Sequence, residues 1–242
     1  MNLRLCHLYP DHLNIYADRG NIAVLAQRCR WRGIEVGVLP CGIGEPLPDA
    51  DLLYVGGGQD RDQLLVAEDL AGRADAVRAA VDGGAALLAV CGGYQLLGHA
   101  YHGQGRERIP GIGLVDLHTE AGSRRMIGNV ALSCELEPGR PHTLVGFENH
   151  AGRTYLGPGV RPLGRVLHGH GNNGEDGCEG VRAGRVLGTY VHGPLLPKNP
   201  WLADWLIAEA LARRNGPVAL EPLDDRLELE AHRAALAVAA HG

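Results

Sequence analysis

The sequence predicts an α/β fold with a mostly parallel central sheet flanked by helices. Three observations lead to this class. Short apolar runs alternate with amphipathic helical segments, the runs are nearly continuous in apolar residues, and glycines follow directly after two of them. Such strands, separated by helices, are typical of a parallel sheet that is covered on both faces.

The order of elements is clearest in the N-terminal part of the chain. We expect strands at 3–9, 34–39, 51–55 and 85–90, with helices at 21–32 and 63–81. After Gly111 the pattern changes to short strands joined by turns rich in Gly and Pro. These strands are expected at 112–118, 128–136, 143–148, 163–167 and 186–191, and as extra antiparallel strands they would extend or cap the sheet.

Two more helices are expected at 200–214 and 224–240. The sequence has no repeat and no long linker, so we expect one domain over 1–242 with a C-terminal helical tail over about 217–242. The tail could dock on its own domain or on a partner.

The composition narrows the class of protein. The chain has 242 residues, of which 45% are hydrophobic, and a net charge of −5, which does not favour nucleic-acid binding. No apolar run reaches the roughly 18 residues of a membrane-spanning helix, and the N-terminus lacks a signal peptide pattern. Six scattered cysteines without a C-x-x-C pair fit reduced thiols. We therefore expect a cytoplasmic protein.

The segment around Cys91 carries the strongest chemical signal. An apolar strand runs directly into Cys91, two glycines follow, and a helical pattern begins. This layout is typical of a nucleophile elbow, which exposes the thiol at the carboxyl end of the sheet. The helix N-terminus would favour the thiolate, and the N–H of Gly92 could bind an oxyanion. The alternative is a small buried residue at a strand end.

Two further strand ends complete the candidate site. His192 follows the strand at 186–191 and could serve as the base for Cys91. The turn Gly56-Gly57-Gly58 lacks the patterns of phosphate loops, so a backbone N–H near Gly57 is expected as a second oxyanion donor. The pair His168 and His170 gives an incomplete ligand set, and we predict no metal site.

These segments resemble class I glutamine amidotransferases, whose C-x-G-x-Q motif is matched by Cys91, Gly93 and Gln95. The ending Thr189-Tyr190-Val191-His192-Gly193 is similar to the branch that contains cobyric acid synthase. Four further segments resemble the GatD family, the glutaminase subunits of lipid II isoglutaminyl synthase: 13–21, 146–154, 169–173 and 192–199.

The resemblance implies a mechanism and a set of residues. Cys91 would attack the side-chain amide of glutamine, and His192 would shuttle protons. N–H groups near Gly57 and Gly92 would stabilise the oxyanions. The substrate-binding arginine maps best onto Arg125, whose fork could hold the α-carboxylate of glutamine; Arg124 is the neighbouring alternative.

The resemblance also implies a heterodimer with a MurT-like subunit of the Mur ligase type. That partner would bind ATP and Mg and would use the ammonia to convert the D-glutamate of lipid II into D-isoglutamine, near the inner face of the membrane. No cofactor is expected in this chain. The alternatives are the glutaminase of another biosynthetic amidotransferase, of the cobalamin type, or a catalytically silent binding domain.

One position departs from the pattern of the class. Many class I members carry a carboxylate two residues after the histidine, and this sequence has Pro194 there. The site is therefore either a Cys-His dyad or one in which another group orients the imidazole. Asp18, Glu148 and Asn149 are the candidates.

Overall fold

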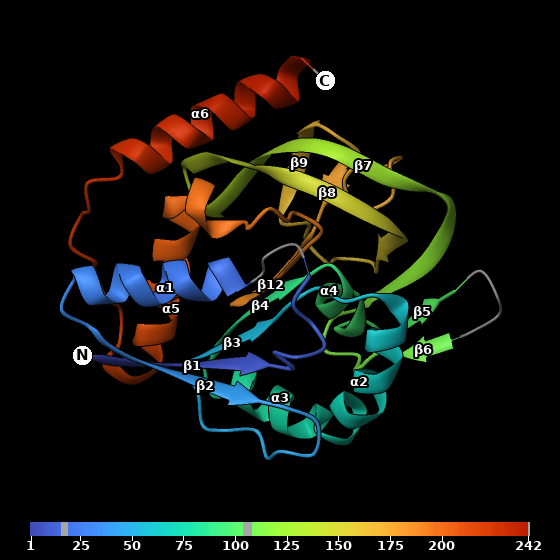
Figure 1. Ribbon diagram of the computed structural model, residues 1–242, viewed down its shortest axis with the longest axis horizontal. Helices are drawn as coiled ribbons and strands as arrows, with labels where there is room; N and C mark the ends of the chain where they lie inside the picture. Colours follow the sequence, from blue (N-terminus) through green and yellow to red (C-terminus); the bar gives the residue numbers. More distant parts are fainter. Residues whose placement is uncertain (16–18, 104–107, 242) are drawn as a thin grey trace.

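Two sheets form the frame of the protein in the computed structural model, which describes residues 1–15, 19–103 and 108–241 (Figure 1). The first has six strands in the order β11-β12-β4-β3-β1-β2. All of its neighbouring pairs are parallel except β11 with β12. Its strands are β1 (Asn2–Leu8), β2 (Glu35–Cys41), β3 (Leu52–Val55), β4 (Ala86–Val90), β11 (Val181–Ala183) and β12 (Val186–Thr189).

The second sheet is built around a long antiparallel hairpin, seen at the top of Figure 1. Its two strands, β7 and β8, are joined by a turn in which Gly139 has a φ of 75°, a conformation that favours glycine. The sheet consists of β5 (Ala100–His102), β6 (Arg108–Pro110), β7 (Leu117–Glu137), β8 (Arg140–Leu156), β9 (Gly164–His168) and β10 (Cys178–Glu179).

Helices cover the parallel sheet, whose central strands β3, β4 and β12 are fully buried. Helices α1 and α5 pack together, and α5 contacts β1, β3 and β4. Figure 1 shows α2 and α3 on the opposite side. The helices are α1 (Arg19–Trp31), α2 (Asp60–Gly72), α3 (Ala74–Asp82), α4 (Gly92–Leu96), η1 (Leu196–Lys198), α5 (Pro200–Asn215) and α6 (Arg226–His241).

The C-terminal segment is fastened to the first helix by a buried arginine. The guanidinium of Arg28, 1% exposed, donates to both carboxylates of Asp204 and Asp225 at 2.6–3.0 Å. Beyond this point α6 lies across β7, β8 and η1. There the ring of His232 contacts Thr143 Oγ1 and the carbonyl of Lys198, each at 2.7 Å.

The structure confirms the predicted fold class and corrects three details. The single helix expected at 63–81 is two helices, because Arg73 between them has non-helical dihedral angles (φ −110°, ψ 12°). The strands after Gly111 mostly form a second sheet, and only β11 and β12 join the parallel one. The strand expected at 112–118 is wrong for most of its length, since β7 begins at Leu117.

Candidate functional site

Cys91 occupies a strained turn between a buried strand and a helix. β4 ends at Val90, α4 begins at Gly92, and Cys91 has a φ of 49° and a ψ of −108°. A positive φ is unusual for a residue with a side chain and is held only where the surroundings fix it. One such constraint is the Cys91 N–H, which donates to the carbonyl of Thr189 at 2.8 Å. This geometry is that of a nucleophile elbow.

The two glycine turns lie side by side, as the order of the parallel strands requires. The Gly93 N–H donates to the carbonyl of Gly56 at 3.1 Å. A Cβ atom on Gly93 would lie 2.7 Å from the carbonyl oxygens of both Gly56 and Val55, so this approach needs glycine. The N–H of Gly92 lies in the first turn of α4, where no intrahelical acceptor is available. The carbonyl of Gly57 accepts from the Ile15 N–H at 3.1 Å.

His192 follows β12, the strand next to β4, so it leaves the same edge of the sheet as Cys91. The residue is 1% exposed. Its backbone pairs with Phe147 of β8: the His192 N–H donates to the Phe147 carbonyl at 2.8 Å, and the Phe147 N–H donates back at 3.2 Å. This bridge joins the second sheet to the carboxyl edge of the first.

A cavity of about 460 Å³ opens above the elbow. Of the predicted site residues, Cys91 and Arg125 contribute to its wall, together with Gln63, Gln95 and Asn149. Of the described residues, Gly57, Gly92, Arg124 and His192 are not among those lining the cavity. The structure thus brings Arg125 rather than Arg124 to the cavity of Cys91.

A chain of side-chain hydrogen bonds supports the cavity wall. Gln63 Nε2 donates to Gln95 Oε1 at 3.0 Å, and Gln95 Nε2 donates to the Tyr190 hydroxyl at 3.1 Å. The Tyr190 hydroxyl also lies 2.7 Å from Thr154 Oγ1, which lies 2.8 Å from Thr119 Oγ1. Because both amide termini of Gln95 are engaged, its orientation toward the cavity is fixed.

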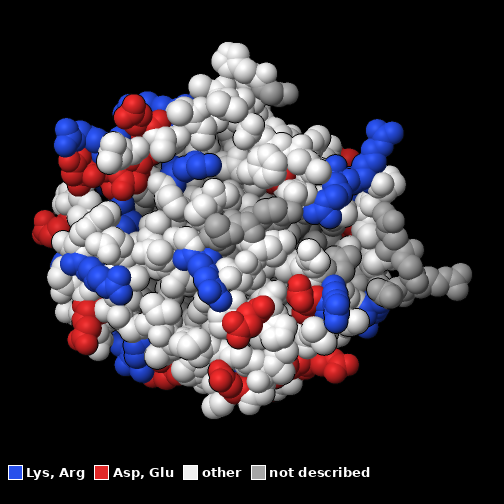
Figure 2. All heavy atoms as spheres, in the orientation of Figure 1, with Lys and Arg blue, Asp and Glu red and all other residues white. Residues whose placement is uncertain are grey.

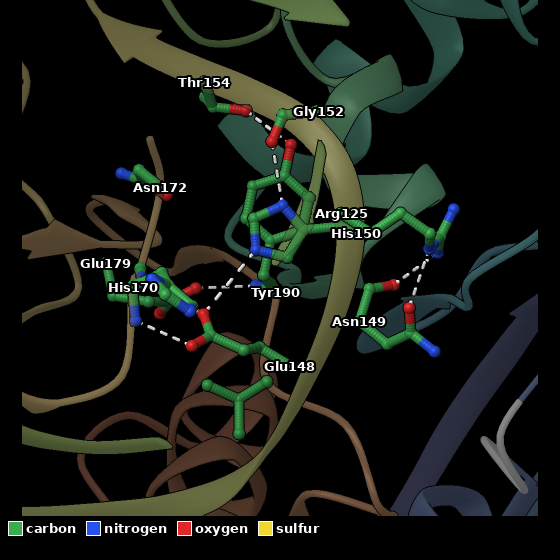
Figure 3. Close-up of polar contacts among 12 residues, drawn as sticks. Arg125, Glu148, Asn149, His150, Gly152, Thr154, His170, Asn172, Glu179 and Tyr190 are labelled. Atoms are coloured by element: carbon green, nitrogen blue, oxygen red, sulfur yellow. Dashed lines mark hydrogen bonds and ion pairs between the residues drawn. The ribbon is translucent and has the colours of Figure 1, made fainter. Parts of the chain in front are cut away.

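Glu148 and His150 form a buried pair on β8 (Figure 3), and His150 is one of the residues that line the cavity. The Glu148 carboxylate accepts from the N–H groups of His170 (2.6 Å) and Gly171 (3.0 Å), and it lies 3.6 Å from His150 Nε2. His150 Nδ1 lies 2.8 Å from the carbonyl of Gly152, so this nitrogen carries a proton. Burial lowers the pKa of His150, and the nearby carboxylate of Glu148 raises it in part. His150 was not among the residues predicted from the sequence, although it lies in the segment 146–154 that resembles GatD.

Asp18, Glu148 and Asn149 are the candidates for a group that orients His192, the alternative being a Cys-His dyad. Asp18 lies outside the described residues. Glu148 binds the backbone of 170–171, and Asn149 binds Arg125.

Glu179, which the sequence did not single out, is a buried acid bonded to the segment that leads to His192. Its carboxyl accepts from the Tyr190 N–H at 2.6 Å and from the Thr189 hydroxyl at 3.0 Å. Burial raises its pKa to about 8, against the effect of these hydrogen bonds and of nearby His192. Glu179 thus holds the two residues that lead to His192. A single Glu in a Gly-rich stretch gave no signal.

Comparisons with known proteins define the class to which this fold and cavity belong. Residues 4–200 match the family model of the CobB/CobQ-like glutamine amidotransferase domain. The structure of PurLQS from Thermotoga maritima superposes with a TM-score of 0.58 at 17% identity, covering 98% of this chain and 100% of that one. The chain belongs to the CobB/CobQ-like glutamine amidotransferase family, and the predicted class is confirmed.

Two relatives are more specific. The chain is 38% identical to the lipid II isoglutaminyl synthase (glutamine-hydrolyzing) subunit GatD of Staphylococcus aureus, over 95% of this chain and 93% of that protein. It is 36% identical to the same subunit of Streptococcus pneumoniae, over 94% of this chain and 88% of that protein. The predicted resemblance to GatD is therefore confirmed along nearly the whole chain.

Neither a helix that could span a membrane nor a cluster of three or more His, Cys, Asp or Glu that could hold a metal ion is found among the described residues. On the face that Figure 2 shows, acidic and basic side chains are interspersed.

Proposed function

We propose that this chain is the glutaminase subunit of a lipid II isoglutaminyl synthase. One observation carries the proposal: Cys91 stands on a strained elbow and lines the same cavity as Arg125. The similarity to GatD over nearly the whole chain supports the particular assignment.

The reaction begins with Cys91. Its thiolate attacks the side-chain amide carbon of glutamine, and the carbonyl electrons move onto the oxygen. Backbone N–H groups near Gly57 and Gly92 stabilise this oxyanion. When the oxyanion collapses, the C–N bond breaks, His192 delivers a proton to the leaving nitrogen, and ammonia departs from a thioester.

Water then completes the cycle. His192 takes a proton from the water molecule, the resulting hydroxyl adds to the thioester carbon, and the Cys91 sulfur leaves with the bonding pair. Glutamate is released and the thiolate is restored. Throughout the cycle, Arg125, which lines the same cavity as Cys91, holds the α-carboxylate of the substrate.

The ammonia passes to a Mur-ligase-like partner in a heterodimer. The partner binds ATP and Mg, activates the α-carboxyl of the D-glutamate residue in lipid II, and forms D-isoglutamine. This chain itself needs no cofactor for the thioester chemistry. The complex works in the cytoplasm beside the inner face of the membrane, where a lipid-linked acceptor is accessible.

The test is glutamate release from glutamine by the native chain, Cys91→Ser and Cys178→Ser, each with and without the Mur-ligase-like partner. Cys178 is a matched control, since it is a partly exposed thiol in β10. We expect release by the native chain and the control, none by Cys91→Ser, and stimulation by the partner. No release from the native complex would overturn the proposal. If the native chain releases glutamate at the same rate with and without this partner, the result would favour the glutaminase of another amidotransferase, such as one of the cobalamin type.

A further inference from the structure

The strand that carries Arg125 leaves the regular pairing of the hairpin next to the cavity. Ala121 of β7 pairs with Gly152 of β8, and the next pair is Met126 with His150. β7 therefore advances five residues where β8 advances two. Extra residues of this kind bend a strand and redirect its side chains, and they are frequent beside active sites. Arg125 is the last residue of this bulge.

Arg153 fastens the backbone of the bulge to the facing strand. One terminal nitrogen of its guanidinium donates to the carbonyl of Arg124 at 2.8 Å, and the other donates to the carbonyl of Ala151 at 3.0 Å. The bulge also packs closely on this group, because a Cβ atom on Gly122 would lie 2.7 Å from Arg153 Cζ. The position of the bulge is therefore set by a side chain of β8.

Asn149 fixes the guanidinium of Arg125 itself (Figure 3). Arg125 Nε donates to Asn149 Oδ1 at 2.9 Å, and Arg125 Nη2 donates to the Asn149 carbonyl at 2.9 Å. Two bonds to one residue determine the plane of the guanidinium. They use two of its five N–H groups. The other three are available to a carboxylate in the cavity, which Arg125 and Asn149 both line.

The segment that bears Asn149 is itself rigidly held. Its neighbours Glu148 and His150 point to the other side of β8, where Glu148 accepts two backbone N–H groups and His150 stacks on Tyr190 with ring centroids 3.6 Å apart. An arginine on a long flexible stem is thereby held before substrate arrives. Such preorganisation improves binding because less side-chain freedom is lost.

We propose that Asn149 and Arg153 are positioning residues that set the preference of the site for substrates with an α-carboxylate. They act through Arg125 and do not touch the reacting amide. The inference rests on the proposed function, because it takes glutamine as the substrate.

The test compares glutamine with 4-aminobutanamide, which keeps the amine and the reacting amide but lacks the α-carboxylate. Ammonia release by the complex with the partner gives kcat and KM for each. We expect Asn149→Ala to raise KM for glutamine about 3- to 10-fold, to leave kcat nearly unchanged and to reduce the preference over 4-aminobutanamide by the same factor. Arg153→Ala should change the preference in the same direction.

Two further variants separate positioning from general damage. Asn129→Ala is the matched control, an exposed asparagine on β7 that faces α6, and it should leave both constants unchanged. Asn149→Ala removes the bond from Arg125 Nε to Asn149 Oδ1 and keeps the one to the Asn149 backbone carbonyl. It should add nothing to Arg125→Ala, because without the guanidinium Asn149 has nothing left to position.

The outcomes are distinct for the two proposals. If the native complex releases no ammonia from glutamine, the proposed function itself fails. If it is active and Arg125→Ala raises KM, but Asn149→Ala leaves the preference intact or adds its full effect to Arg125→Ala, the positioning role alone is overturned.

Discussion

Phe147 and His192 exchange two backbone hydrogen bonds, of 2.8 and 3.2 Å, although 45 positions separate them in the sequence. This bridge ties β8 to the edge of the parallel sheet where β4 and β12 end. As a result, Cys91 and His192 come from one sheet, while Arg125 and Asn149 come from the other. The candidate site is built where the two sheets meet.

The close approach of the two glycine turns should not tolerate a methyl group. In Gly93→Ala the new Cβ would lie 2.7 Å from two backbone oxygens, which cannot move as a side chain would. We expect a loss of roughly 1–3 kcal/mol in the free energy of unfolding, and a large loss of glutaminase activity, because the elbow must shift. Thermal unfolding and glutamate release measure the two effects. Gly37→Ala on β2, with open space around it, is the control; equal effects in both variants would contradict the explanation.

The hydroxyl of Tyr190 should matter for the cavity wall. Tyr190→Phe keeps the ring against His150 but leaves Gln95 Nε2 and Thr154 Oγ1 without this partner in a buried place. A lost buried hydrogen bond of this kind costs about 1–3 kcal/mol. We expect a lower melting temperature and a raised KM for glutamine.

Tyr155→Phe is the control, because the ring of Tyr155 stacks on exposed His118, and it should change neither quantity. If Tyr190→Phe also leaves the melting temperature and KM unchanged, the chain of hydrogen bonds does not support the cavity wall.

Glu179 predicts a specific dependence of stability on pH. In the unfolded chain its carboxyl loses a proton near the ordinary pKa of 4.5, whereas burial raises the folded pKa to about 8. Between these values the folded state binds more protons, so stability falls as pH rises through this window. The contribution of the Glu179 carboxyl to the free energy of unfolding is complete below pH 4.5 and is lost as pH passes 8. Between these values the free energy of unfolding falls by at most about 1.4 kcal/mol per pH unit.

Glu179→Gln is expected to remove this part of the pH dependence. The Gln amide can still accept from the Tyr190 N–H and can donate to the Thr189 hydroxyl, so the fold should be kept. The melting temperature of the variant should exceed that of the native chain at pH 8 and converge with it at lower pH. Glu230→Gln, on an exposed position of α6, is the control. If the melting temperatures of Glu179→Gln and the native chain change with pH in the same way, the raised pKa of Glu179 is refuted.

The bonds from Arg28 that anchor the C-terminal segment should depend on Asp225 and not on the neighbouring Asp224. Asp225→Asn leaves the buried Arg28 guanidinium with only one of its two carboxylates, at an expected cost of roughly 1–3 kcal/mol. Limited proteolysis should then cut more readily before α6. Asp224→Asn breaks only an exposed pair with Arg226 and should leave the melting temperature and the cleavage rate nearly unchanged. Similar behaviour of the two variants would rule out the anchor.

The fold class and the elbow at Cys91 could be predicted because their signals are local. An apolar strand followed by two glycines and a helical pattern lies within a dozen residues, and the structure has the turn at Cys91 with a φ of 49°. The strand that leads to His192 could also be predicted, because its apolar run is a local signal. The assignment of strands to sheets could not be predicted, because the pattern of one strand does not say which neighbour it pairs with.

The sequence by itself determined the fold class and the cysteine at a strand end, because motifs and periodicity are properties of contiguous residues. The candidate arginines were implied by the resemblance to glutamine amidotransferases. Only the tertiary structure decided that Arg125 rather than Arg124 faces the cavity, since this depends on a bulge in β7 measured against β8. It also decided that Glu179 is buried against Thr189 and Tyr190. Burial and proximity arise from the packing of distant segments, so no local pattern of residues encodes them.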